Sequence, residues 1–344
     1  MKTQILSLMW MSALFLASCG STETPSKEKG DGHSQKHDEN HQHTYACPMH
    51  PDIIGEEGAT CPKCGMKLEH NDNAGKNNGD SYFMQFSAAP AEIESGKEAT
   101  LLFTPKIKGK EDEMVPLDVE HEKKLHLIIV SNDLAYFEHV HPEYQADGSY
   151  QIKVLPKEKE FTNGKGQNET RFENGGGYTL FADYVPSGAS HQLEKIDLTV
   201  KGNPYKEVSF EKERLTFSGE GVTVALEAEG GWITNKQMHI KATVKKGNKT
   251  LDAATFDNYL GAKSHMVVLK TGTFEYLHVH PEVENGNLDL HTTFESAGIY
   301  RGWLQFQIEG KLIAADFVIN VKDGASSTEA SSENHEHNHE GHTH

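Results

Sequence analysis

An internal duplication constrains the fold of this chain more than any other feature. The segment LHLIIVSNDLAYFEHVHPE returns in the second half as SHMVVLKTGTFEYLHVHPE, with three histidines at the same spacing in both copies. A later pair of segments also matches, with Tyr178 opposite Tyr300. Internal repeats indicate repeated structural units. We therefore expect two related domains, and 344 residues are long enough to bury two hydrophobic cores.

The repeated region has the pattern of an all-β protein. From Tyr82 to Val321, short runs rich in β-branched and aromatic residues are broken by Gly, Asn, Asp and Pro. No run keeps a period of 3.6 residues over a dozen positions, which argues against helices. Each copy has about seven expected strands in about 115 to 120 residues, the size of an immunoglobulin-like β-sandwich. The first copy also carries a polar insertion over residues 157–174.

The fold class that we predict is all-β: two tandem immunoglobulin-like sandwich repeats after a small metal-ribbon module, with disordered His-rich tails. The boundary between the repeats is placed near Gly202-Asn203-Pro204. The expected segments are a signal peptide at 1–18, a tether at 19–44, the module at 45–69, a linker at 70–81, repeats at 82–203 and 204–322, and a tail at 323–344.

The N-terminus has the pattern of a secretory signal. Lys2 precedes an apolar run, residues 5–16, which is followed by Leu-Ala-Ser-Cys. This run is too short to span a membrane as a mature helix. The ending resembles a bacterial lipoprotein signal, which implies lipidation of Cys19 and a lipid-anchored protein of the bacterial cell envelope, facing the periplasm or the surface. A plain signal peptide with a chance cysteine is the alternative.

The charge of the chain excludes one class of partner. Its formal net charge is −18. Nucleic-acid binding needs a basic surface, so we expect no nucleic-acid partner. An acidic protein attracts cations, although the same charge also serves solubility.

Three cysteines lie close together in the segment 45–69. Cys47 and His50 have C-x2-H spacing, and Cys61 and Cys64 have C-x2-C spacing. An odd number of clustered thiols cannot all form disulfides with one another, and two such pairs can surround one ion tetrahedrally. The neighbouring thioethers favour Cu(I); they belong to Met49 and Met66. A unit of this size cannot hold a core, so metal binding would supply its folding energy.

The motif YACPMHP followed by CPKCGM resembles the small heavy-metal-binding domain of copper- and silver-efflux adaptors and of copper-transporting ATPases. The resemblance covers residues 45–69 only. It implies that Cys47, His50, Cys61 and Cys64 are the leading metal ligands and that both methionines are secondary ones. The alternative is a structural zinc ribbon without a role in metal traffic.

The duplicated histidines are the second candidate site. They are His126, His139 and His141 in the first copy, and His265, His278 and His280 in the second. If two-residue turns at 132–133 and 271–272 close the hairpins, the first histidine of each triad faces the second. The third lies two residues further on and therefore on the same face. Three imidazoles there would suit Cu(II) or Zn(II). Alternatively, they are structural residues at the edge of a sandwich core.

Further histidines alternate with polar residues near both ends of the chain. Such segments bind borderline metals weakly and with many ligands, although a polar tail without metal is the alternative. The histidines are His33, His37, His41 and His43 before the module, and His335, His337, His339, His342 and His344 at the C-terminus.

These patterns favour a lipid-anchored protein that captures, buffers or delivers Zn2+, Cu+ or Cu2+, with a metal transporter or efflux complex as a further partner. We assign no catalytic residues and expect no enzyme. Three alternatives remain: a metalloenzyme that uses the His triads, an efflux-pump adaptor, and an adhesion module with structural metals. The adaptor is disfavoured because the chain shows no heptad-repeat helical hairpin.

Overall fold

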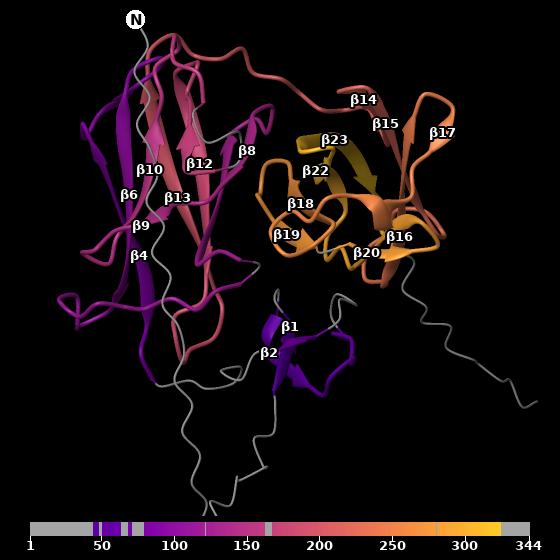
Figure 1. Cartoon of the computed structure of the whole chain (residues 1–344), viewed down its shortest axis with the longest axis horizontal. Helices are drawn as coiled ribbons and strands as arrows, with labels where there is room; N and C mark the ends of the chain where they lie inside the picture. Colours follow the sequence, from indigo (N-terminus) through magenta and orange to yellow (C-terminus); the bar gives the residue numbers. More distant parts are fainter. Residues whose placement is uncertain are drawn as a thin grey trace, which may run out of the picture. The chain divides into compact units, whose positions relative to one another are not determined.

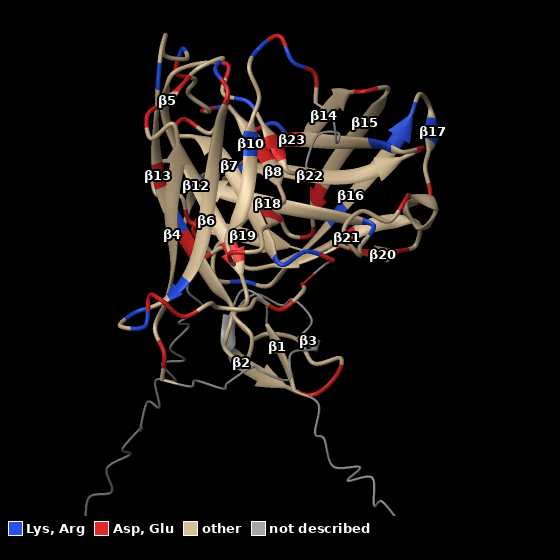
Figure 2. Cartoon of the chain, turned by 60° about the vertical axis from the view of Figure 1, so that its left-hand side comes forward, with Lys and Arg blue, Asp and Glu red and all other residues tan. Residues whose placement is uncertain are grey.

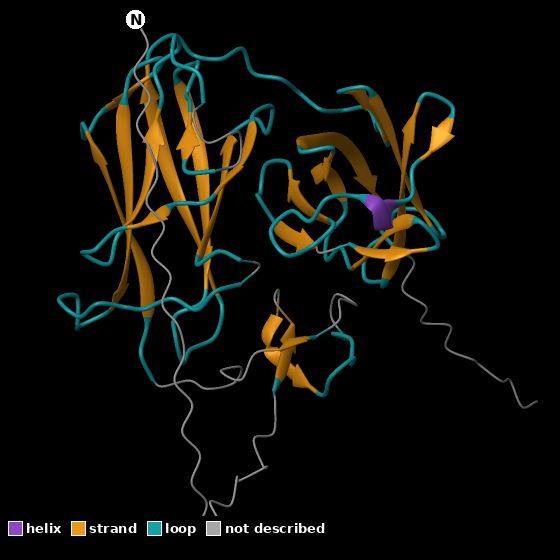
Figure 3. Cartoon of the chain, viewed as in Figure 1, coloured by secondary structure: helices purple, strands orange, loops and turns teal. Residues whose placement is uncertain are grey.

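The computed structural model describes residues 44–47, 50–62, 68–70, 79–120, 122–161, 167–279 and 281–324. The predicted signal peptide, Cys19, both histidine tails and most of the two predicted polar linkers lie outside these residues. The described part consists of β-strands with one short 3-10 helix, Ala253–Thr255, which confirms the all-β class (Figure 3). Within it, no helix combines the length and the apolar character that crossing a bilayer requires.

The cysteine segment folds into a small antiparallel sheet with strand order β2-β1-β3. Its strands are β1 (Tyr45–Cys47), β2 (His50–Gly55) and β3 (Glu69–His70). The backbone of Cys47 pairs with that of His50, so the first and last residues of the C-x2-H motif lie opposite each other on neighbouring strands. Leu68 donates a backbone hydrogen bond to the Ala59 carbonyl oxygen (2.8 Å).

The first repeat contains two sheets (Figure 1). One sheet consists of β4 (Tyr82–Ala89), β6 (Ala99–Ile107), β9 (Glu143–Tyr144), β10 (Tyr150–Val154) and β11 (Glu169–Thr170). The other has the order β5-β13-β12-β7-β8 and consists of β5 (Ile93–Glu94), β7 (Leu125–Ser131), β8 (Phe137–Val140), β12 (Gly176–Tyr184) and β13 (Gln192–Lys201).

The second repeat has the same two-sheet plan. One sheet consists of β14 (Thr216–Gly219), β15 (Val222–Ala228), β16 (Met238–Lys246), β17 (Lys249–Thr250), β20 (Glu282–Glu284) and β21 (Asn287–Thr292). The other has the order β19-β18-β22-β23 and consists of β18 (Ser264–Lys270), β19 (Tyr276–Val279), β22 (Gly298–Ile308) and β23 (Lys311–Val321). This order repeats β8-β7-β12-β13, as expected for a duplicated domain.

Each sandwich has its own core. Buried and partly buried residues alternate along β6, so one face of this strand packs inward. Leu101 and Ile152 belong to the first core, and Ile240 and Leu290 belong to the second. Acidic and basic residues lie in many of the loops and also on strands, for example the lysine of the two-residue strand β17 (Figure 2).

The strands that carry the first histidine of each triad are buried on both faces. All residues of β7 are buried, and so are all but the last residue of β18. Leu127 and Ile129 pack into the first core. Ile128 instead belongs to a third apolar cluster that also contains Val267 of the other sandwich. The histidine-bearing face of each sheet therefore packs against the other repeat.

Candidate metal centre

The hairpin β7–β8 brings the first triad together, but in a different register from the predicted one. Ile128 pairs with His139, and Leu127 pairs with Val140, so continuing the register places His141 opposite His126. In the second hairpin, Val267 pairs with His278. The prediction that the first two histidines of each triad face one another directly is therefore wrong. The predicted two-residue turns are longer loops, and the resulting shift of two residues keeps all side chains on the same face.

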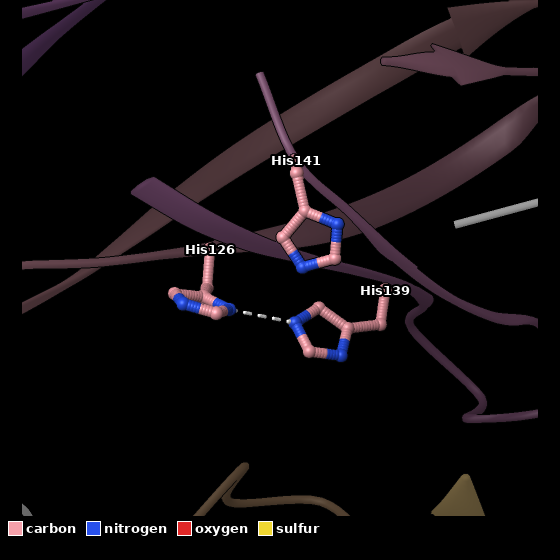
Figure 4. Close-up of side chains that lie close together, drawn as sticks. All are labelled: His126, His139 and His141. Carbon is pink, nitrogen blue, oxygen red and sulfur yellow. Dashed lines mark hydrogen bonds between the residues drawn. The ribbon is translucent and has the colours of Figure 1, made fainter. Parts of the chain in front are cut away.

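The three histidines of the first triad converge (Figure 4). Each offers one nitrogen, and these atoms lie within 4.8 Å of one another. Nδ1 of His126 is 3.1 Å from Nε2 of His139. The ring of His141 lies 5.0 Å from that of His126 and 4.7 Å from that of His139. All three side chains are buried, with 4% of His141 exposed.

The hydrogen bonds of these rings define which nitrogens carry protons. Nε2 of His126 lies 3.1 Å from the carbonyl oxygen of Glu120, which can only accept, so Nε2 is the donor. Nδ1 of His139 likewise donates to the Oε1 atom of Gln305 (2.9 Å). In neutral imidazoles, Nδ1 of His126 and Nε2 of His139 then both present lone pairs, and they face each other. A cation bound between the two nitrogens would relieve the repulsion between their lone pairs. In metal-bound histidines, the other ring nitrogen typically donates to an oxygen acceptor, as it does here.

The second triad lies against the first. The ring of His278 is 5.9 Å from that of His139 and 6.3 Å from that of His126, and the ring of His265 is 6.3 Å from that of His139. Nε2 of His265 donates to the carbonyl oxygen of Tyr259 (2.9 Å), which leaves its Nδ1 unprotonated in the neutral ring. The two predicted sites are thus parts of one histidine cluster between the sandwiches. His280 lies outside the described residues.

Two polar contacts across this interface are reciprocal. Gln305 on β22 binds His139 of the first repeat, and Asp183 on β12 accepts from Nδ1 of His278 of the second repeat (3.4 Å). Asp183 pairs with His126 within its own sheet, and Gln305 pairs with His265 in the same way. The two side chains therefore hold equivalent places in the two repeats.

Two aromatic contacts between the repeats are reciprocal in the same way. Phe137 stacks on Trp303 with centroids 4.5 Å apart, and Tyr276 stacks on Phe181 at 5.1 Å. Each pair joins a residue of a histidine hairpin to the neighbouring strand of the other repeat. The repeats thus associate like the subunits of a symmetric dimer, in which the same patch meets itself.

Burial and neighbouring charges adjust the pKa values in the cluster. Burial, His126 and His278 hold the pKa of His139 well below its usual value, so its ring stays neutral, the form that binds metal. Burial opposes ionisation of Asp183, but His191 and His278 outweigh it and hold the pKa of this carboxyl well below its usual range. Burial likewise opposes the charge on His191, yet Asp183 raises the pKa of His191 to about 9. The cluster thus contains an ionised carboxylate, paired with the protonated ring of His191, close to the neutral ring of His139.

Two surface pockets are lined in part by residues of the cluster. His141 lines one together with Lys123, Lys124 and Glu143. His139 and Gln305 line the other, which also contains residues of both repeats. Both pockets therefore border residues of the cluster, although the histidine side chains themselves are buried.

In the cysteine module, the structure describes only part of the predicted ligand set. Cys47 and Cys61 are both buried, with 1% of each exposed, and both contribute to an apolar cluster with Leu68. Side chains of the other predicted ligands lie outside the described residues; these are His50, Cys64, Met49 and Met66.

The sequence prediction missed the residues that support the histidines. Asp183 and Gln305 each lie five positions after the matched tyrosines, Tyr178 and Tyr300. Both are buried polar residues on strands whose other residues are mostly apolar and buried. Aligning the repeats from the tyrosines onward and looking for polar residues on these largely apolar strands would have found them, together with the matched pair Thr179 and Arg301.

Comparison with protein families agrees with this organisation. The model of a family described as Domain of unknown function (DUF8832) matches residues 78–202 and 216–323. The chain belongs to this family. The model of the heavy metal binding domain matches residues 44–71, so the chain also carries a heavy-metal-binding segment, as the motif predicted. No curated protein matches the chain.

Among solved structures, the similarities are weak. The Escherichia coli adhesin FdeC is 15% identical, with 71% of this chain and 66% of that chain covered and a TM-score of 0.23. A Salmonella alpha-2-macroglobulin mutant is 10% identical, with 70% and 14% covered and the same score of 0.23. The surface layer protein SbsC is 9% identical, with 71% and 31% covered and a score of 0.20. Scores this low carry no functional argument.

Proposed function

We propose that this protein is a lipid-anchored metal-binding protein of the bacterial cell envelope that captures copper or zinc and delivers it to a transport or efflux system. The cysteine module would acquire the ion, and the histidine cluster between the sandwiches would hold it. The cluster offers nitrogen ligands, which suit Cu(II) and Zn(II), while the module offers thiolates, which suit Zn(II) and Cu(I).

One observation carries the proposal for the histidine cluster. In the neutral rings of His126 and His139, the outer nitrogens donate to oxygen acceptors, so the lone pairs of the inner nitrogens face each other across 3.1 Å. Purely structural histidines would place a donor opposite an acceptor. Two inward lone pairs, with His141 beside them, are the arrangement that a bound cation needs.

Metal stoichiometry of matched variants tests the proposal. Full-length protein purified without oxygen would be compared by elemental analysis and X-ray absorption with two variants, His126→Gln/His139→Gln and Cys47→Ser/Cys61→Ser. Glutamine keeps the size and polarity of the buried positions. We expect the cysteine variant to lose sulfur coordination and to keep the ion of the histidine cluster, and the histidine variant to keep sulfur coordination and to bind one nitrogen-ligated ion less than the wild type. Equal nitrogen-bound metal in wild type and in a folded histidine variant would contradict a metal site in the cluster.

The proposed anchor has a separate test. Lipidation at Cys19 would place the wild-type protein in the membrane fraction and label it with radioactive palmitate. A Cys19→Ala variant should lose the label and appear in the soluble fraction. An unlabelled wild-type protein would refute the anchor without touching the metal sites.

A further inference from the structure

Two histidines and a carboxylate meet on the outer face of the other sheet of the second sandwich. His239 on β16 pairs across the strands with His291 on β21, and Asp289 lies two residues before His291 on the same face. The intervening Ile240 and Leu290 point into the core. The three polar side chains therefore project from a different sheet from the one that carries the second histidine hairpin.

Their geometry fits one small cation. One nitrogen or oxygen atom from each side chain lies within 4.8 Å of the other two. Oδ2 of Asp289 is 2.8 Å from Nε2 of His291, and the two imidazole rings are 4.4 Å apart. Ligand atoms around tetrahedral zinc are about 3.3 Å apart, given Zn–N distances of about 2.05 Å. Small side-chain rotations close the remaining gap, because His239 is exposed and the other two are only partly buried.

The surroundings are acidic. A surface pocket over these residues is lined by His239, Asp289 and three glutamates, with Lys241 as its basic member. The glutamates are Glu227, Glu229 and Glu284, the last on the acidic strand β20 (Figure 2). Their charge attracts a cation and offsets the cost of removing its water.

The first sandwich lacks this group at the matching place. The β6–β10 pair corresponds to β16–β21, with Leu101 opposite Ile152 where the second sandwich has Ile240 opposite Leu290. The positions that match His239, His291 and Asp289 are then occupied by Thr100, Lys153 and Gln151. The ligand set is not a shared feature of the two repeats, unlike the histidine triads.

We propose that His239, His291 and Asp289 form a further, solvent-accessible site for a divalent cation of the zinc class, with water completing its coordination. Two histidines, one carboxylate and an open position are a usual zinc ligand set. The site shares no residue with the buried cluster, so either can exist without the other.

Residue-resolved footprinting of the full-length protein tests this site. Diethyl pyrocarbonate modifies unprotonated imidazole nitrogens that solvent can reach, and a bound ion blocks that nitrogen. We expect His239 and His291 to be modified in metal-free protein and protected by micromolar Zn2+, as measured by peptide mass spectrometry. Asp289→Asn should raise the Zn2+ concentration needed for half-protection at least tenfold.

Two matched variants complete the experiment. Glu309→Gln removes one negative charge elsewhere on the same sandwich and should leave protection unchanged. His291→Lys installs the residue type found at the matching place of the first sandwich, and it should abolish protection of His239. Equal modification of both histidines with and without saturating Zn2+ would overturn the site, and so would equal protection in Asp289→Asn and Glu309→Gln. Because the readout is specific to these histidines, neither result bears on the buried cluster.

Discussion

The side chain of Gln305 determines which nitrogen of His139 is available to a metal. It comes from the other repeat and accepts a hydrogen bond from Nδ1 of His139 (2.9 Å), which leaves Nε2 unprotonated in the neutral ring. An imidazole ring held in this way loses less conformational entropy when it binds a metal, and its free nitrogen is more basic. The residue contributes to the site without being a ligand itself.

Replacing this acceptor should weaken metal binding. We predict that Gln305→Leu lowers the affinity of the histidine cluster by about 10- to 100-fold, because His139 loses its orienting partner. Isothermal titration with Zn2+ in a Cys47→Ser/Cys61→Ser/His291→Lys background measures the effect. Gln307→Leu, two residues along the same strand, should have little effect. An unchanged affinity in a folded Gln305→Leu protein would show that the contact does not position the ligand.

The ion pair between His191 and Asp183 (2.5 Å) should make stability depend on pH. The folded pKa of His191 is about 9, above the unfolded value of about 6.5. Its stabilisation is therefore complete below about pH 6.5 and is lost as the pH rises through 9. We predict that His191→Gln lowers the melting temperature of the metal-free protein by several degrees at pH 6 and much less at pH 10. Equal losses at both pH values would contradict this.

At the scale of elements, the histidine hairpins show what the sequence could and could not predict. Strand alternation correctly placed the histidines of each described hairpin on one face. The register was wrong because Asp133 accepts hydrogen bonds from Ser131 and Ala135, which stabilises a wider loop than a two-residue turn. Leu134 takes a positive φ of 58° in this loop, a conformation that no residue pattern indicated.

The sequence also did not predict what the two hairpin faces pack against. Val130 and Phe137 have the same apolar pattern whether their face meets its own core or another domain. The prediction considered only the edge of a sandwich core. The sequence of one repeat does not show that its hairpin face packs against the other repeat, because the residues that make this contact are far apart in the chain.

The stacked pair Phe137–Trp303 should hold the two sheets together. We predict that Trp303→Ala costs about 3–5 kcal/mol, since it removes a large buried side chain and its stacking contact with Phe137. Because the lost contact joins the repeats, calorimetry should show two separate unfolding transitions and weaker metal binding. Trp232→Ala, within the second core, should instead destabilise that sandwich alone. A single cooperative transition in Trp303→Ala would contradict the role of this stack.

At the scale of the whole molecule, a metal in the cluster would couple the repeats. An ion whose free concentration is one hundred times its dissociation constant stabilises the native state by about 2.7 kcal/mol. We predict that chelation lowers the melting temperature of the Cys47→Ser/Cys61→Ser protein by about 5 °C or more. The same treatment should change little once His126→Gln/His139→Gln is added. An equal decrease in both proteins would assign the effect to metal bound elsewhere.

The reciprocal contacts between the repeats have a consequence for how the cluster behaves on dilution. Separate copies of such a domain would come apart as their concentration fell, and a binding site shared between them would vanish. Two copies on one chain meet in a first-order step, at an effective concentration in the millimolar range for a short connection. The shared site therefore persists even when the cell holds only a few copies of the protein.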